Sequence, residues 1–338
     1  MLPIPLPPLP EQHRIVTRIE ELFSRLDAGV EALQKAKAQL QSYRQSVLKA
    51  AVEGRLTEEW RKGYTEDLVP LHDFLEERRS KVLDKKRLSS GESLQNLPDT
   101  WISAKIGEIA DVVRGASPRP AGDPKYFGGE IPWITVGEIT KDSKIYLESV
   151  SSFLTEEGKE RSRYIEPGTF LLTNSGATLG VPKVTKIGGC INDGSVAILN
   201  LNETLKVFLY YYLSTQTKSL RQINQGAAQP NLNTGIVKNL QIPLPPFNEQ
   251  LKIAEKIESY LAVINNEDKI LHMTLKCSDR LRQSILKHAF EGRLIPQDPN
   301  DEPAFMLLER IKAEKANDAT RRGSMINRSN TRQMRLTQ

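Results

Sequence analysis

Ile4-Pro5-Leu6-Pro7-Pro8, near the start of the chain, returns as Ile242-Pro243-Leu244-Pro245-Pro246, and this repeat decides the fold. The match continues without a gap, so that residues 4–56 pair with residues 242–294 and 21 of the 53 aligned positions are identical. Both copies end on the sequence Glu-Gly-Arg-Leu. A period this long is not that of a solenoid repeat. The chain therefore has two equivalent elements with an unlike segment between them, and that segment is where we look for function.

Each copy contains a long stretch without proline whose apolar residues follow a helical spacing. From Glu11 to Glu53 they recur at alternate steps of four and three, which is typical of the seam of a coiled coil. The stretch from Glu249 to Glu291 is apolar near its ends and more polar in its middle. Each would form a helix about 65 Å long at 1.5 Å per residue, ended by the glycine of Glu-Gly-Arg-Leu in a left-handed cap. Since neither helix can bury its own stripe, each needs the other copy or another chain.

The rest of the chain divides into four parts. Residues 57–98 form a connector with a predicted short helix near Pro70–Leu83, and a similar helix is predicted from Pro303 to Lys315. Residues 99–241 carry short apolar runs separated by glycine and proline, which predict a mixed, mainly β domain with a helix near Leu205–Leu220. Residues 316–338 are poor in apolar residues and predict a disordered basic tail. The repeat then assigns residues 1–56 and 242–315 to two helical spacer regions.

Composition limits the class of protein. Hydrophobic residues make up 38% of the 338 residues, which fits long solvated helices better than one compact core. No apolar run could span a bilayer and the first residues are no secretory signal, so we expect a cytoplasmic chain with no membrane partner. The net charge is +5, but the tail supplies most of it, so this charge is poor evidence for nucleic-acid binding. Within the β domain, residues 161–241 hold eight basic and three acidic side chains, which indicates an anion-facing side.

Three polar loops of the β domain carry side chains suited to DNA contacts. Val113 to Pro120 combines two arginines and a serine with a glycine, and arginine reads guanine edges or clamps phosphate. Asn174 to Gly180 is followed by two lysines but lacks the Gly-Lys-Ser/Thr ending of a nucleotide site. Gln225 to Asn233 is rich in amides, which can pair with adenine edges. Ordinary surface turns, including an Asx-type turn that precedes a strand in the third loop, are also compatible with these sequences.

The candidate DNA-binding residues come from these loops and the basic positions near them. Lys183, Lys186 and Arg221 are predicted to contact phosphate, because basic side chains dominate this half of the domain. Arg114 and Arg119 are predicted to lie nearer base edges, together with the two loop glutamines. The full set is Arg114, Ser117, Arg119, Asn174, Ser175, Thr178, Lys183, Lys186, Arg221, Gln225, Gln229, Asn231 and Asn233.

No catalytic or metal site can be read from the sequence. The two cysteines and four histidines follow no zinc spacing, and no serine, cysteine or histidine constellation is present. Asp142, Glu157 and Lys159 match a nuclease pattern in spacing alone, and short motifs match by chance. We therefore predict a non-catalytic protein. Two alternatives remain open: a coiled-coil assembly protein whose β module binds protein, and a nuclease that uses these three residues.

Taken together, the motifs resemble those of the DNA-specificity (S) subunit of type I restriction–modification systems. Pro-Leu-Pro-Pro-x-x-Glu-Gln precedes each long helix, and Gln-Ser-x-Leu-Lys-x-Ala-x-Glu-Gly-Arg-Leu ends it. Within the segment between them the resemblance is carried by Ile131-Pro132-Trp133-Ile134, the run from Gly168 to Gly180, and Gln229-Pro230-Asn231-Leu232-Asn233. These motifs occur in the family's order from residue 3 to about residue 316.

The resemblance implies an α+β fold, in which one mixed, mainly β target-recognition domain joins two long helices that pair as an antiparallel coiled coil. The family pattern has two recognition domains, so this chain resembles a half-length S subunit. It would read one half-site of double-stranded DNA, dock methyltransferase (M) and restriction (R) subunits, and pair with itself or with a second S chain. The chain itself would bind no cofactor, because S-adenosylmethionine, ATP and Mg belong to the partner subunits.

Overall fold

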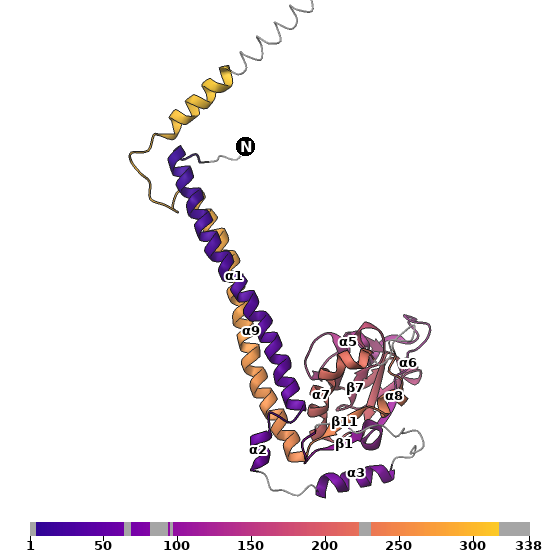
Figure 1. Cartoon of the computed structure of the whole chain (residues 1–338). Helices are drawn as coiled ribbons and strands as arrows, with labels where there is room; N and C mark the ends of the chain where they lie inside the picture. The colour runs from indigo at the N-terminus through magenta and orange to yellow at the C-terminus, as the bar shows by residue number, and fades with distance from the viewer. Residues whose placement is uncertain (1–4, 64–68, 82–93, 95–96, 223–230, 318–338) are drawn as a thin grey trace, which may run out of the picture. The chain divides into compact units, whose positions relative to one another are not determined.

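The computed structural model describes residues 5–63, 69–81, 94, 97–222 and 231–317 (Figure 1). It contains two compact units, Met1–Leu40 with Asn265–Gln338 and Gln41–Ile264, which we describe separately. Two helices of 44 residues each, α1 (Leu9–Val52) and α9 (Phe247–Phe290), contribute to both units. Their limits agree closely with those predicted from the repeat. Among the described residues, no helix combines the length and hydropathy that crossing a membrane requires.

In the first unit, the N-terminal part of α1 lies antiparallel to the C-terminal part of α9 (Figure 1). Arg282 of α9 forms an ion pair with Asp27 of α1 and lies over the Phe23 ring, 4.6 Å from its centroid. Nearer the start of α1, Arg14 pairs with Asp301 at 2.6 Å, beyond the end of α9. Residues 304–317 then form a short helix, as predicted, which continues two residues into the predicted tail. The rest of that tail lies outside the described residues.

Both long helices end in the same cap. Gly54 and Gly292 have φ values of 74° and 66°, the left-handed conformation that glycine adopts most readily. In each cap the N–H of the following arginine donates to a carbonyl five residues back. These bonds are Arg55 N to Ala50 O at 2.9 Å and Arg293 N to His288 O at 2.8 Å. The predicted glycine caps are therefore confirmed.

The second unit contains the β domain, built from three sheets. The five-stranded sheet has the order β2 (Asp111–Arg114), β10 (Ser195–Leu199), β7 (Phe170–Thr173), β8 (Pro182–Thr185), β4 (Tyr146–Leu147). The four-stranded sheet has the order β5 (Phe153–Leu154), β3 (Phe127–Ile134), β9 (Gly189–Ile191), β6 (Arg163–Ile165). The third sheet pairs β1 (Ile102–Lys105) with β11 (Gln241–Leu244). The prediction of a mixed, mainly β domain is confirmed.

Short helices precede or connect these strands. They are α2 (Glu58–Lys62), α3 (Val69–Lys81), α4 (Ile106–Ile109), α5 (Val136–Thr140), α6 (Glu156–Glu160), the 3-10 turn η2 (Gly176–Thr178) and α8 (Thr234–Lys238). The longer α7 (Glu203–Gln222) matches the helix predicted near Leu205–Leu220, and α3 matches the predicted connector helix. Burial in α7 raises the pKa of both Tyr211 and Tyr212 to about 12. The short helix α2 was not predicted from the sequence.

The segment before α9 is a strand and not only an extended lead into the helix. Ile102 lies opposite Leu244 and Ala104 opposite Ile242 in the antiparallel β1–β11 pair. Proline is tolerated in a strand at a sheet edge, where no ladder hydrogen bond is lost. The β structure therefore continues three residues past the predicted border at residue 241.

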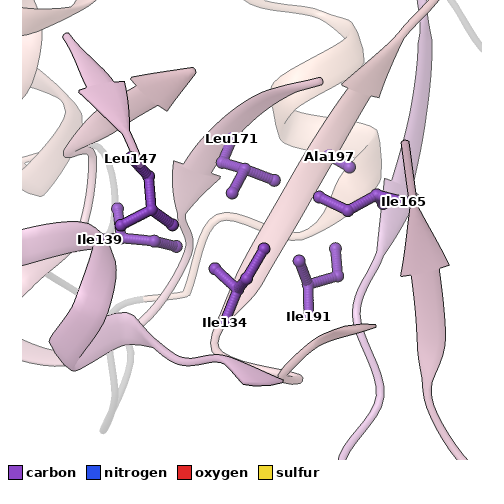
Figure 2. Packing of buried hydrophobic residues seen from close by; sticks show 7 residues of the cluster. All are labelled: Ile134, Ile139, Leu147, Ile165, Leu171, Ile191 and Ala197. Atoms are coloured by element: carbon purple, nitrogen blue, oxygen red, sulfur yellow. The ribbon is translucent and has the colours of Figure 1, made fainter. Parts of the chain in front are cut away.

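The two larger sheets share one apolar core (Figure 2). Leu171 and Ala197 come from central strands of the five-stranded sheet, whereas Ile134 and Ile191 come from paired strands of the four-stranded sheet. Figure 2 shows these side chains pointing toward one another, with Ile139, Leu147 and Ile165 completing the cluster. Because both sheets bury side chains in this cluster, their edges hold fixed positions relative to each other.

A buried carboxylate joins the β domain to the ends of both long helices. Oε1 of Glu249, in the first turn of α9, accepts hydrogen bonds from the Thr57 hydroxyl at 2.6 Å and from Arg61 Nε and Nη2 at 3.0 and 2.8 Å. Its Oε2 accepts the indole N–H of Trp101 at 2.9 Å. Arg61 also donates to the carbonyl oxygen of Gly54, the cap of α1. One fully buried side chain thus fixes the end of α1, α2, the approach to β1 and the start of α9.

Replacing Glu249 with glutamine should lower the free energy of unfolding by about 3 kcal/mol, because the largely buried Arg61 guanidinium loses its counter-charge. Glu255→Gln is the control, because Glu255 pairs with Lys252 on an exposed face of the same helix and should cost less than about 0.5 kcal/mol. Urea unfolding followed by tryptophan fluorescence measures both. Equal costs for the two variants would contradict this role of Glu249.

Candidate nucleic-acid interface

The strand register brings the predicted loops to one end of the five-stranded sheet. Arg114, at the end of β2, lies beside Val196 near the start of β10, and Ser195 lies opposite Thr173 at the end of β7. The turn at residues 174–180 then leads into β8, which is antiparallel to β7. In an antiparallel sheet, the end of one strand and the start of its neighbour lie at the same end of the sheet. The loops at residues 114–120, 174–180 and 192–194 therefore meet there.

Asp193 is the hydrogen-bonding centre of this end. Its Oδ1 accepts the Ser117 hydroxyl at 2.6 Å, its Oδ2 lies 3.3 Å from Arg119 Nη2, and its carbonyl oxygen accepts Arg114 Nε at 3.0 Å. The Ser117 hydrogen bond and the charges of Arg119 and Arg114 lower the pKa of the Asp193 carboxyl. Asp193 is thus ionised at neutral pH, and it holds two arginines whose side chains stay exposed. Asp193 was not among the residues predicted from the sequence.

A glycine allows the first loop to approach the Asp193 turn. A Cβ atom on Gly115 would lie 2.1 Å from the carbonyl oxygen of Asn192, which no side chain tolerates. The Gly115 N–H donates to Ser195 O at 3.0 Å, and the next N–H donates to Ile191 O at 3.1 Å. Arg114, Ser117 and Arg119 are therefore placed by main-chain contacts on either side of this glycine.

Asn174 ties the second loop to the other two. Its main-chain N–H donates to Gly194 O at 3.0 Å, and its side-chain Nδ2 donates to Asp193 O at 3.3 Å. Its carbonyl oxygen accepts the Leu232 N–H at 2.7 Å, and the neighbouring Ser175 forms an isolated antiparallel bridge with Asn231. The Asn174 side chain is fully buried, which contradicts its assignment as a DNA contact. It instead holds three loops together.

The C-terminal end of α7 also reaches the second loop. Arg221 Nε donates to Leu179 O at 3.2 Å, and the Thr217 hydroxyl lies 3.2 Å from Gly180 O. Arg221 is exposed and lies next in space to the turn that contains Thr178. We call this group the loop face; it consists of Arg114, Ser117, Arg119, Asn174, Ser175, Thr178, Asp193, Arg221 and Asn231.

Two of the predicted phosphate contacts lie elsewhere. Lys183 is only 1% exposed, and its ammonium group donates to the Asp142 carboxylate at 2.5 Å and to the carbonyl oxygens of Asp142 and Lys144. All three of its donor positions are thus used inside the domain, and its prediction as a phosphate contact is wrong. Lys186 follows the far end of β8, where it pairs with Glu148 at 2.9 Å and lies over the Tyr146 ring. It does not share the loop face.

The third loop is described only in part. Asn233 caps α8, because its Oδ1 accepts the Ile236 N–H at 2.9 Å, so this residue forms a local turn of the kind weighed against DNA binding. The turn leads into a helix and not into a strand. Gln225 and Gln229 lie outside the described residues, and their assignment stays a prediction.

The nuclease alternative has no support in the geometry. Asp142 pairs with Lys183, Glu157 pairs with Lys125 at 3.3 Å, and Lys159 lies near Glu156. No group of three histidine, cysteine or acidic side chains in the described parts of the chain is placed to hold a metal ion. Cys190 and Cys277 are free thiols, and burial raises the pKa of the Cys190 thiol.

A family model, the type I restriction modification DNA specificity domain, matches residues 98–272, which is more than half of the chain. The chain belongs to this family. The resemblance inferred from the motifs is thereby confirmed. The specificity subunit of the MjaIX enzyme from Methanocaldococcus jannaschii is 30% identical over 222 residues, 64% of this chain and 49% of the relative. The specificity subunit of the Escherichia coli EcoBI enzyme is 28% identical, and the match covers 95% of this chain and 66% of that subunit.

Solved structures share the fold. A chain from a study of assembly and conformational transition in the type I restriction–modification system matches with a TM-score of 0.60 at 22% identity. The match covers 86% of this chain and 62% of that chain. The HsdS subunit from Thermoanaerobacter tengcongensis has a TM-score of 0.52 at 22% identity, with 86% and 61% coverage. The expected α+β fold is confirmed. The chain spans about half the length of the MjaIX subunit and about two thirds of the length of the EcoBI subunit. Both relatives are named as specificity subunits, in agreement with a non-catalytic chain.

The contacts of Asp193 give the β domain a pH dependence. A carboxyl whose pKa is lower in the folded state stabilises the fold above its unfolded pKa, and this stabilisation is lost as the pH falls through the folded value. Asp193→Asn should therefore unfold at lower urea than the parent chain at pH 7. The difference between the two chains should shrink as the pH falls below about 3.9, the unfolded aspartate pKa. A difference that persists undiminished at low pH would contradict this assignment.

Proposed function

We propose that this chain is the sequence-specific DNA-binding specificity subunit of a type I restriction–modification complex and reads one half-site with the loop face. The observation that carries the proposal is the gathering of exposed Arg114, Arg119 and Arg221 at one end of the sheet. Arginine offers up to five N–H donors in a plane, so an arginine held through one N–H retains others for a base edge or phosphate. Membership of the DNA-specificity family supports the same role.

Some residues of the loop face position the loops, and others are the proposed DNA contacts. Asp193 and Asn174 position the loops, since the one orients two arginines and the other is buried among main-chain groups. Arg221 is the proposed phosphate contact. The remaining proposed contacts on the loop face are Arg114, Ser117, Arg119, Ser175, Thr178 and Asn231. Asn233, Gln225 and Gln229 stay sequence predictions.

The character of the loop face favours DNA over a protein partner. Among the described residues, the large hydrophobic side chains that are exposed on the β domain are Tyr146, Phe153 and Tyr164, and none belongs to the loop face. A surface that binds protein usually presents aromatic or aliphatic anchors at its centre. The loop face instead presents guanidinium, hydroxyl and amide groups, which are the groups that contact phosphates and base edges.

We propose further that the chain works within a larger assembly. Its relatives are named as specificity subunits of type I restriction enzymes, which supports docking of M and R subunits. Those subunits would bind S-adenosylmethionine, ATP and Mg. One recognition domain reads one half-site, so a second S chain, as a self-dimer or a different chain, would supply the other half-site.

Arg221→Ala should weaken binding to duplex DNA of every sequence and reduce the slope of log affinity against log salt by about one, because one phosphate contact is lost. Lys186→Ala is the matched control, because that lysine is also exposed but follows the end of β8 that lies away from the loop face. Fluorescence anisotropy with labelled duplexes over a salt series measures both. If Lys186→Ala lowers the slope and Arg221→Ala does not, the phosphate-binding end of the sheet has been assigned wrongly.

The recognised site should be an interrupted palindrome if two copies of this chain assemble, because identical loop faces read identical half-sites. Sequencing of methylated adenines in cells that express the chain with its methyltransferase subunit gives this site directly. The mass of the purified S component should then be near twice 38.0 kDa. An asymmetric motif would mean that a different S chain supplies the second half-site.

A further inference from the structure

An exposed arginine that does not belong to the loop face, Arg163, borders it at the start of β6. In the strand register Arg163 lies opposite Ile191, the last residue of β9, and the turn at residues 192–194 leads from there to β10. The start of β6 therefore lies at the same end of the domain as the loop face. Arg163 was not among the residues predicted from the sequence.

Two hydrogen bonds hold the start of β6 against the first loop. The Ser162 hydroxyl donates to Ala116 O at 2.7 Å, and Arg163 Nε donates to Arg114 O at 2.9 Å. Both acceptors are main-chain oxygens, so these bonds do not depend on which side chains that loop carries. A guanidinium group also has N–H donors on Nη1 and Nη2. Arg163 is thus fixed through Nε and can still donate from its two terminal nitrogens.

Arg221 is held in the same way on another side of the loop face, because its Nε donates to Leu179 O at 3.2 Å. Among the described residues, no carboxylate oxygen lies within 4.0 Å of a guanidinium nitrogen of Arg163 or Arg221. Lys125, Lys159 and Lys186 of the same domain instead pair with glutamates at 3.3, 3.5 and 2.9 Å. The two arginines therefore keep their positive charge available to an anion.

The acceptors that hold these two arginines lie too far apart for both side chains to share one phosphate group. Arg114 O belongs to the last residue of β2, whereas Leu179 O lies in the turn from β7 to β8. The sheet order places β10 between β2 and β7, and β8 beyond β7. Neighbouring strands lie about 4.8 Å apart, so the two acceptors are separated by roughly 10–14 Å. Asp193 lies between them, because it bonds both Ser117 and Asn174.

We infer that Arg163 is a second phosphate contact of this domain, on the opposite side of the loop face from Arg221. The inference rests on the proposed DNA binding and adds to it a residue outside the loop face. Phosphate contacts fix the position of a protein on the duplex but carry no base identity. One such contact leaves the domain free to pivot about it, whereas two contacts on either side of the loops hold Arg114 and Arg119 in one orientation to the bases.

Two substitutions separate this role from a purely structural one, which would need only the hydrogen bond to Arg114 O. Glutamine carries its Nε2 donor as many bonds from Cα as arginine carries Nε. Arg163→Gln can therefore keep the bond to the first loop while it removes the charge and the terminal donors. Arg163→Lys keeps the charge, and an ammonium group contacts phosphate as a point charge.

Fluorescence anisotropy of the full chain with a labelled duplex of arbitrary sequence, over a salt series, tests the inference. For Arg163→Gln the slope of log affinity against log salt should fall by about one. The ratio of parent to variant affinity should then decrease about 3.5-fold between 50 and 200 mM salt. Combining Arg163→Gln with Arg221→Ala should lower the slope by about two, because distant contacts add. Arg163→Lys should keep the parent slope, as should the control Lys186→Gln at the other end of β8.

Several outcomes would overturn the inference while the proposed function stands. These are an unchanged slope for Arg163→Gln in a series where Arg221→Ala lowers it, a double variant that loses only about one unit, and equal losses for Arg163→Gln and Arg163→Lys. A loss confined to one duplex sequence would also overturn it, because Arg163 would then contact a base edge. A parent chain that shows no salt-dependent binding to duplex DNA would overturn the proposed function, and this inference with it.

Discussion

The second unit depends on the carboxylate of Glu249. This group is fully buried and accepts four N–H or O–H donors from Thr57, Arg61 and Trp101. Since an ion pair out of water is expensive unless every partner is satisfied, the carboxylate fixes those partners in one arrangement. The β domain can then keep a defined orientation to the helix ends, which a flexible linker would not provide. For a protein proposed to read DNA at a fixed spacing, that orientation matters as much as the loops.

Elements that the internal repeat specifies were predictable from the sequence, and contacts between residues far apart in the chain were not. The helices, their glycine caps and the family followed from the repeat, because each copy specifies its own start, seam and end. The convergence of the loops was predictable only in outline. Lys183 was misassigned because its partner, Asp142, lies 41 residues away, and a lysine in a polar loop sequence carries no sign of burial. β11 was missed because its prolines conceal an edge strand.

Asp193 shows a different limit. An acidic side chain within a basic half-domain argues against anion binding if charges are only counted. In the structure its carboxylate accepts hydrogen bonds from Ser117 and Arg119, and its carbonyl oxygen accepts one from Arg114. Asp193 therefore orients both arginines. The pattern Asn192-Asp193-Gly194 between two strands could have signalled a tight turn, but not which side chains would meet there.

Several of the bonds that join the loops run between main-chain atoms: Gly115 N to Ser195 O, Asn174 N to Gly194 O, and Leu232 N to Asn174 O. Main-chain groups are the same whatever side chain they carry. The exposed tips can therefore change from one sequence to another while the loops keep their places, provided that Gly115 and Asn174 remain. Such a scaffold lets the exposed surface of the loops change by single substitutions without a new fold.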